Sequence, residues 1–162
     1  MSKKLHLIRH SYAENPNEKK DINRRLTHEG QSTVRALGRH LINQNFNPDI
    51  ILCSTAERTR ETALNLVEEL EMSEQVIDYQ DVIYNASVRE LLSVLNGLPE
   101  DHNEVTIIGH NPTITFFGEY LSGSIIGNMD PAGIVTIRIE KLKWSEISQG
   151  TGIFEAYYHP NH

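Results

Sequence analysis

The chain has 162 residues and a mass of 18.5 kDa, a length that fits one ordinary domain with a single hydrophobic core. Apolar residues make up 38% of the sequence and charged residues 23%, which excludes intrinsic disorder as the main state. Fifteen Lys and Arg residues against 22 Asp and Glu residues give a net charge of −7, which argues against nonspecific binding to nucleic acid or to an anionic membrane.

Cysteine content and the N-terminal residues bear on the compartment. Cys53 is the only cysteine, so no disulfide can form within the chain, and nothing indicates an oxidising environment. The apolar run within residues 1–10 is too short for a signal peptide, and no later segment could span a bilayer. We therefore expect a cytoplasmic protein with one domain, residues 1–162, and no membrane partner.

The first half of the chain alternates between patterns typical of strands and of helices. Residues 3–9 form the first predicted strand, and the polar residues 12–25 form a long loop after it. Thr27 opens a helix that carries four apolar residues on one face. They are Val34, Leu37, Leu41 and Ile42. Residues 50–53 are a continuous apolar run, typical of a strand buried on both faces, and residues 63–70 belong to a second amphipathic helix.

The second half continues this alternation. A short strand is predicted at residues 76–79, and residues 87–90 form a capping box at the start of a third helix. Residues 104–109 are apolar enough for a buried strand, and a fourth helix is predicted over residues 112–121, because proline suits a first helical turn. Two alternating segments close the chain as strands, residues 133–140 and 152–158.

This order of elements predicts the fold class. It is an α/β fold, a three-layer sandwich with a mostly parallel central sheet flanked by helices, and with antiparallel strands at its end. In such a sheet the carboxyl ends of the parallel strands meet at one edge, where ligands bind.

Three polar motifs fall at this edge. Arg9 and His10 end the first predicted strand, residues 54–62 follow the second long strand, and His110 follows the strand at 104–109. Histidine supplies a nitrogen nucleophile, and arginine binds phosphoryl oxygens through a planar fork of donors. Two histidines and two arginines at one edge therefore indicate phosphoryl transfer, which depends mainly on positioning and charge stabilisation.

At these motifs the chain resembles the histidine phosphatase superfamily, which also contains the cofactor-dependent phosphoglycerate mutases. Residues 7–10 are similar to its nucleophile motif, residues 53–63 to its Ser-x-x-x-Arg-x-x-x-Thr motif, and residues 108–112 to its second histidine motif. Residues 24–30 resemble a stretch common in the small SixA-like branch, the protein phosphohistidine phosphatases. The resemblance covers most of residues 3–140 and implies a phosphoglycerate mutase-like fold.

The resemblance also implies roles for four residues. His10 would attack the phosphoryl group and carry it as a phosphohistidine, while Arg9, Arg58 and His110 would bind and stabilise it. Water would then hydrolyse the intermediate. No metal and no cofactor are implied, because these groups neutralise the charge that Mg²⁺ neutralises in kinases.

Further residues are expected to contact the phosphate or the substrate. They are Ser11, Arg24 and Asn111. Ser11 stands where the family usually has Gly, and its hydroxyl is expected near the phosphate. Thr62, one helical turn after Arg58, is expected to help orient the arginine side chain.

The proton donor is the weakest part of the pattern. Many relatives that cleave esters have a glutamate after the third strand, where this chain has Asn85. Three acidic residues remain as candidates, namely Glu14, Asp21 and Asp81. An alkoxide leaving group needs protonation more than an imidazole does. The lack of an obvious general acid therefore favours cleavage of P–N over P–O bonds.

We therefore expect a metal-independent phosphatase with a phosphohistidine enzyme intermediate. Its expected substrate is phosphohistidine on a partner signalling protein, and no nucleic-acid partner is expected. Two alternatives remain open at this stage. One is a phosphomonoesterase for small molecules such as a sugar or nucleotide phosphate, and the other is a non-catalytic module that recognises phosphate.

Overall fold

A six-stranded mixed sheet forms the middle layer of the fold, in the order β3-β2-β4-β1-β5-β6. The structure is a computed structural model and describes residues 2–16 and 19–160. The strands are β1 (Ser2–Arg9), β2 (Ile50–Cys53), β3 (Ile77–Tyr79), β4 (Glu104–Gly109), β5 (Ile134–Glu140) and β6 (Ile153–Tyr158). The four helices in this part of the chain are α1 (His28–Ile42), α2 (Glu57–Glu69), α3 (Val88–Asn96) and α4 (Thr113–Ser122).

Strand direction divides the sheet in two. β3, β2, β4 and β1 pair in parallel, whereas β5 and β6 continue the sheet in antiparallel pairing. The predicted mostly parallel sheet with antiparallel closing strands is confirmed. The parallel pairing of β2, β4 and β1 also brings the carboxyl ends of these strands to one edge.

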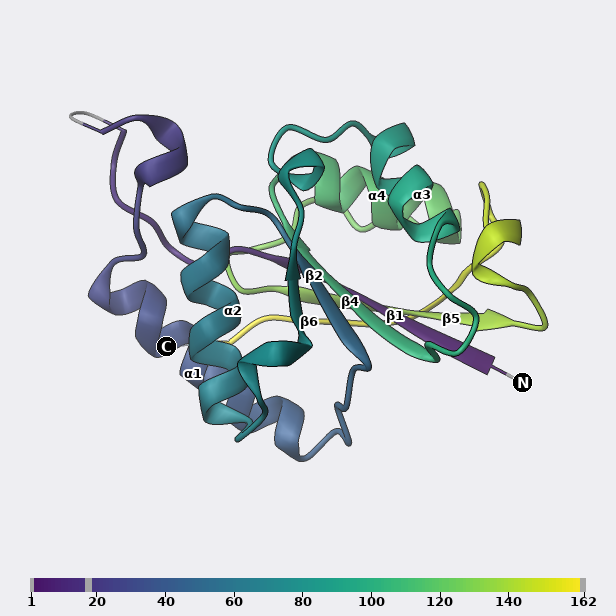
Figure 1. Cartoon of the computed structure of the whole chain (residues 1–162), viewed down its shortest axis with the longest axis horizontal. Helices are drawn as coiled ribbons and strands as arrows, with labels where there is room; N and C mark the ends of the chain where they lie inside the picture. Colours follow the sequence, from purple (N-terminus) through teal and green to yellow (C-terminus); the bar gives the residue numbers. More distant parts are fainter. Residues whose placement is uncertain (1, 17–18, 161–162) are drawn as a thin grey trace.

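The helices cover both faces of the sheet. Figure 1 shows α1 and α2 on one face and α3 and α4 on the other, which confirms the predicted three-layer sandwich. Each face has its own core of fully or nearly fully buried side chains. Burial of one such Leu or Ile side chain contributes about 1.5–3 kcal/mol, so the two cores hold the layers together. None of the described helices is long and apolar enough to cross a membrane.

Local capping fixes where two helices begin. Thr27 Oγ1 accepts a hydrogen bond from the backbone N–H of Gly30 at the start of α1. The capping box predicted for α3 is confirmed, because Ser87 and Glu90 each accept a hydrogen bond from the other's backbone N–H. These bonds satisfy N–H groups that a helix leaves unpaired at its first turn.

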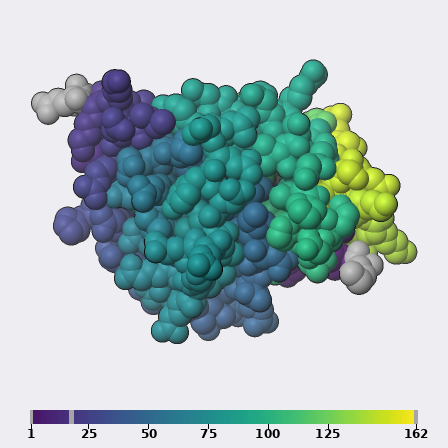
Figure 2. Space-filling view, viewed as in Figure 1, coloured from purple at the N-terminus to yellow at the C-terminus, as the bar shows by residue number. Residues whose placement is uncertain are grey.

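The segment predicted as one long loop contains some regular structure. Asp21–Asn23 forms a short 3₁₀ turn, η1, and Ala13 pairs with Leu26 in an isolated antiparallel bridge. A second 3₁₀ turn, η3 (Asp81–Ile83), follows β3. In the space-filling view the early part of the chain, in purple, packs against the teal part of the surface (Figure 2). Both turns lie next to the candidate site described below.

Candidate active site

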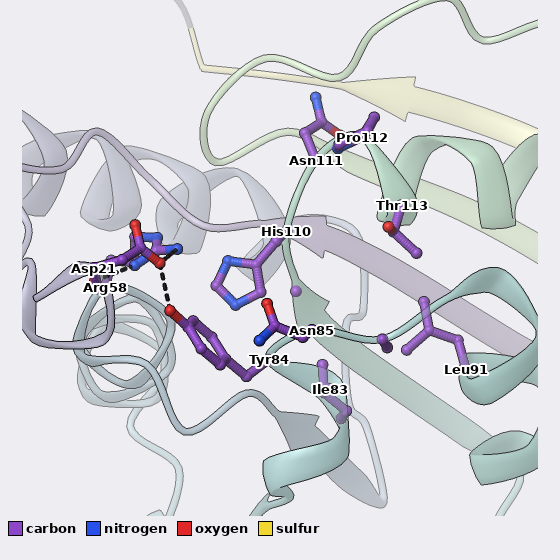
Figure 3. Close-up of a pocket in the computed structure, with 12 residues that line it drawn as sticks. Asp21, Arg58, Ile83, Tyr84, Asn85, Leu91, His110, Asn111, Pro112 and Thr113 are labelled. Atoms are coloured by element: carbon purple, nitrogen blue, oxygen red, sulfur yellow. Dashed lines mark hydrogen bonds and ion pairs between the residues drawn. The ribbon is translucent and has the colours of Figure 1, made fainter. Parts of the chain in front are cut away.

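A cavity of about 290 Å³ lies at the edge of the sheet where β4 ends. Its wall comes from five segments of the chain: η1, the first turn of α2, the end of η3 with the residues after it, α3, and the turn between β4 and α4. Figure 3 shows Asp21, Arg58, Tyr84 and His110 around the same opening, with Asn85 beside them. Residues far apart in the sequence therefore meet at the edge that the strand pattern predicts for a ligand site.

His10 directly follows β1, and its imidazole has a defined proton position. Its Nδ1 lies 2.7 Å from the carbonyl oxygen of Ser11. Because a carbonyl oxygen can only accept a hydrogen bond, Nδ1 carries the proton and Nε2 carries the lone pair. Burial, together with the positive charges of Arg58 and Arg9, lowers the pKa of His10 to about 4. At neutral pH His10 is therefore an uncharged imidazole with Nε2 available as a nucleophile.

His110 lies beside His10, with the two ring centroids 5.4 Å apart. Its Nε2 is 2.8 Å from Ser54 Oγ, at the end of β2. Ser54 Oγ also accepts a hydrogen bond from Ala56 N, so the hydroxyl links the ring of His110 to the first residues before α2. Burial, followed by the charges of His10 and Arg58, lowers the pKa of His110 to about 3.

Three buried nitrogen atoms at this edge have no hydrogen-bond partner among the described residues. They are Arg9 Nε, Arg58 Nε and His110 Nδ1. A buried donor without a partner costs about 1–3 kcal/mol, so donors of this kind favour an anion that can accept from them. Arg9 is held in place by a bond from Nη1 to the carbonyl oxygen of Met129 at 2.8 Å. The edge thus offers several fixed donors to an oxyanion next to the His10 nucleophile.

Asp21 accepts hydrogen bonds from both Nη atoms of the Arg58 guanidinium group. Arg58 Nη1 donates to the backbone carbonyl of Asp21 at 2.8 Å, and Nη2 donates to Asp21 Oδ2 at 2.9 Å. Tyr84 OH donates to the same Oδ2 at 2.6 Å, and Arg24 Nη1 donates to Oδ1 at 2.8 Å. These bonds, from Tyr84 above all, hold the pKa of Asp21 far below its ordinary value. Asp21 is consequently a carboxylate at neutral pH and has no proton to give.

Two other acidic residues predicted as proton donors lie elsewhere. Glu14 Oε1 accepts from Lys19 Nζ and from the backbone N–H of Arg25, both at 2.9 Å. Asp81 is exposed at the start of η3 and is not among the residues that line the cavity. Neither carboxylate therefore faces the cavity in this structure.

The Ser11 hydroxyl does not lie where the sequence analysis expects it. Ser11 is fully buried, and its Oγ donates to the carbonyl oxygen of Gly30 at 2.8 Å. Its backbone N–H donates to Thr62 Oγ1, and Thr62 Oγ1 donates to the backbone carbonyl of Arg58. Ser11 and Thr62 thus fix the backbone next to His10 and Arg58, and neither hydroxyl contacts the arginine side chain.

Asn111 and Arg24 border the site but have other partners as well. Asn111 lines the cavity, and its Nδ2 donates to Asn128 Oδ1 at 2.7 Å and to Met129 O at 3.1 Å. Arg24 Nε donates to the carbonyl oxygen of Glu14 at 2.7 Å. Asn111 therefore holds the loop that orients Arg9, whereas Arg24 anchors the segment that carries Asp21.

Tyr84 is a site residue that the sequence analysis did not select. Its ring meets the His110 ring edge-on, with centroids 5.6 Å apart, and its hydroxyl binds Asp21. The hydrogen bond to Asp21 raises the pKa of Tyr84, so the phenol stays protonated. The stretch after the third strand was a sequence signal, but it drew attention to Asn85 rather than to the neighbouring tyrosine.

Comparison with known proteins relates the chain to one family of phosphatases. Residues 5–81 match the family model of the histidine phosphatase superfamily (branch 1). None of the curated proteins matches the chain.

Similar solved structures span nearly the whole chain. One from Nakamurella multipartitia, described as a phosphohistidine phosphatase SixA, is 25% identical, with a TM-score of 0.83, and the match covers 99% of this chain and 97% of that one. The protein histidine phosphatase SixA in complex with tungstate is 20% identical, with a TM-score of 0.82 and 96% of both chains covered. A mycobacterial glucosyl-3-phosphoglycerate phosphatase is 12% identical, with a TM-score of 0.68, and covers 96% of this chain and 98% of its own. The last two share the fold.

Proposed function

We propose that the chain is a phosphatase of the histidine phosphatase superfamily, whose family model matches residues 5–81, and that it removes phosphoryl groups from phosphohistidine on a partner protein. One observation carries the proposal. His10 is an uncharged imidazole with its proton on Nδ1, and the buried nitrogen atoms of Arg9, Arg58 and His110 that lack a hydrogen-bond partner among the described residues lie at the same edge of the sheet.

The proposed reaction has two steps. His10 Nε2 attacks phosphorus and forms a P–N bond while the bond to the leaving group breaks. Arg9, Arg58 and His110 donate hydrogen bonds to the phosphoryl oxygens, whose charge they stabilise in the transition state. Water then attacks the phosphohistidine and returns His10 to its free state. No proton donor is required in the first step when the leaving group is a protonated imidazole ring.

The acidic residues favour a P–N substrate over an alkyl ester. Asp21 is the one carboxylate among the residues that line the cavity in the described part of the chain, and its hydrogen bonds keep it ionised. An alkoxide leaving group requires a proton from such a residue. An imidazole can leave without one, so this arrangement supports phosphohistidine as the substrate. One relative in fold acts, by its name, on a sugar phosphate ester, and the same experiment tests that class.

The first experiment compares substrate classes. We expect kcat/KM for a histidine-phosphorylated carrier protein to exceed that for a panel of sugar and nucleotide phosphates, with EDTA present throughout. His10→Ala should abolish turnover of every substrate while the protein stays folded, because it removes the Nε2 atom that attacks phosphorus. Circular dichroism provides the folding control.

Three other results would contradict the proposal. A preference for one small ester would identify a phosphomonoesterase, and turnover that survives in His10→Ala would remove His10 from the mechanism. Absence of turnover with every substrate would favour a module that only recognises phosphate.

The proposal extends to the setting of the reaction. The substrate would be a signalling protein that carries phosphohistidine, and the reaction would take place in the cytoplasm without a metal ion. The buried free thiol of Cys53 is compatible with a reducing compartment.

A further inference from the structure

Asp21 has an unusual position for a carboxylate in a site that binds phosphate. It lines the cavity together with Arg58, Tyr84 and His110, and its side chain is 47% exposed. A negative charge at this place repels a phosphoryl dianion, so a role in phosphate binding alone does not account for it. The Asp21 carboxylate is more exposed than the Arg58 side chain that it binds, of which 8% is exposed, and we therefore assign it to the leaving-group side of the site.

Asp21 also has unused capacity as an acceptor. A carboxylate offers about four lone-pair positions. Oδ2 accepts from Arg58 and from Tyr84, whereas Oδ1 accepts from Arg24. Oδ1 therefore has one lone-pair position that the described residues do not use. The plane of the Asp21 carboxylate is fixed by hydrogen bonds from Arg24, Arg58 and Tyr84, which belong to three different segments. An acceptor fixed in this way can form a hydrogen bond with an N–H group of a ligand and so select ligands that carry one.

The chemistry of a P–N bond provides such a group. A phosphorylated imidazole has phosphorus on one ring nitrogen, and protonation of the ring places a hydrogen on the other. An alkyl or aryl phosphate ester has no N–H in the corresponding position. A carboxylate near the leaving group therefore distinguishes the two classes of substrate, and it stabilises the charged ring as the aspartate of a catalytic triad stabilises its imidazolium.

We propose that Asp21 determines the specificity of this enzyme by accepting a hydrogen bond, through Oδ1, from the free N–H of the protonated phosphoimidazole ring of the substrate. This inference rests on the proposed function, because it assigns the leaving-group side of the same site. Tyr84 and Arg24 act as positioning residues, since they hold the carboxylate plane and do not contact the reacting atoms.

The bonds and protons of this step balance. The P–N bond of the substrate breaks as Nε2 of His10 forms its own bond to phosphorus. The electron pair of the broken bond goes to the ring nitrogen and neutralises the positive charge of the ring. The ring leaves as neutral imidazole and keeps the proton that Asp21 binds. Without that carboxylate, a larger share of the bound substrate is unprotonated and would have to leave as an imidazolate.

This proposal predicts a change in pH dependence. The groups that face Asp21 are Arg24, Arg58, Tyr84 and His110. His110 and the nucleophile His10 have pKa values of about 3 and about 4, and the pKa of Tyr84 is raised. His10, His110 and Tyr84 therefore keep their charge between about pH 5.5 and 8.5. A fall in kcat towards high pH in this range would therefore report the protonation of the bound substrate ring.

The experiment measures kcat between about pH 5.5 and 8.5 for two small substrates, phosphoimidazole and para-nitrophenyl phosphate. The rate of His10→Ala is subtracted at each pH, because phosphoramidates also hydrolyse without enzyme. In Asp21→Asn we expect kcat for phosphoimidazole to fall about ten- to a hundredfold at the alkaline end, the loss of one hydrogen bond to a charged group. At the acidic end the loss should be small, because there the ring is protonated without help.

Two further variants separate this role from a structural one. Asp81→Asn removes the same charge from an exposed position outside the cavity, and it should leave the ratio of the two substrates and both pH profiles unchanged. Tyr84→Phe removes one bond to Oδ2 and keeps the carboxylate, so it should shift the profile for phosphoimidazole in the same direction as Asp21→Asn but by less.

Each remaining outcome would overturn the inference. If Asp21→Asn lowers kcat for both substrates equally at every pH, Asp21 only positions Arg58. If it raises activity, the carboxylate competes with the substrate phosphoryl group. Failure of the proposed function has another signature, since wild-type enzyme would then hydrolyse the aryl ester and leave phosphoimidazole intact.

Discussion

At the scale of single residues, His10 is defined by one hydrogen bond and by its surroundings. The bond from Nδ1 to Ser11 O fixes the tautomer, and burial keeps the pKa at about 4, below the usual 6.5. We expect the His10 ring to show the Nδ1–H tautomer in ¹⁵N NMR spectra and to remain uncharged between pH 5.5 and 8. His10→Ala assigns the resonance. A titration midpoint close to 6.5 would contradict this description of the nucleophile.

The sequence could predict which residues lie at the site where their motif directly follows a strand. His10 and His110 directly follow β1 and β4, so their positions follow from the strand pattern. The contact between Tyr84 and Asp21 could not be predicted in this way, because it joins residues 63 positions apart through an irregular loop. The orientation of the Ser11 hydroxyl could not be predicted either, because it depends on a backbone carbonyl group of α1.

At the scale of elements, the strands and helices were predicted correctly because each carries a strong hydrophobic period. Residues 50–53 are apolar throughout because β2 lies between β3 and β4 with helices on both faces of the sheet. The loop 12–25 lacks such a period, so η1 and the Ala13–Leu26 bridge could not be inferred. The loop conformation depends on individual polar contacts, which the sequence pattern does not encode.

Gly30 is the glycine on which the packing of this loop depends. A Cβ atom at position 30 would lie 2.2 Å from the backbone oxygen of Tyr12, and backbone atoms cannot move aside at low cost. We expect Gly30→Ala to lower the free energy of unfolding by about 1–3 kcal/mol and to reduce activity, because the displaced segment adjoins His10 and Ser11. Urea denaturation measures the first effect and kcat the second.

Gly97 provides the matched control for this substitution. It ends α3, and its added Cβ would have no neighbour nearer than 3.6 Å, an ordinary contact. Gly97→Ala should therefore change the free energy of unfolding by less than about 0.5 kcal/mol. Equal destabilisation by the two variants would show that the close approach at Gly30 has no special role.

At the scale of the whole molecule, the net charge of −7 coexists with a positively charged site. Arg9, Arg24 and Arg58 lie at one edge of the sheet, and their charges contribute to the low pKa of His10. The net charge of the sequence predicts that the protein does not bind nucleic acid nonspecifically. It could not predict that these three arginines lie together at one edge of the sheet. The single-domain organisation of residues 1–162 stays a prediction.

The two site histidines also connect the function of the molecule to its stability. Their pKa values are about 4 and about 3 in the folded state, against about 6.5 for an unfolded chain. Between these values the unfolded state binds more protons than the folded state, so stability rises with pH in this range. The contribution of both histidines is complete above pH 6.5 and is lost as pH falls towards 4 and 3.

The urea midpoint should accordingly fall between pH 7 and pH 4.5, and it should fall less in a double variant, His10→Asn with His110→Asn, in which neither side chain titrates. Asp21 adds to the loss only at lower pH, because its carboxylate is protonated below the ordinary range for aspartate. An identical fall in the double variant would assign the acid sensitivity to other groups. The expected result would mean that the buried, uncharged imidazoles that suit nucleophilic attack also limit the stability of the fold in acid.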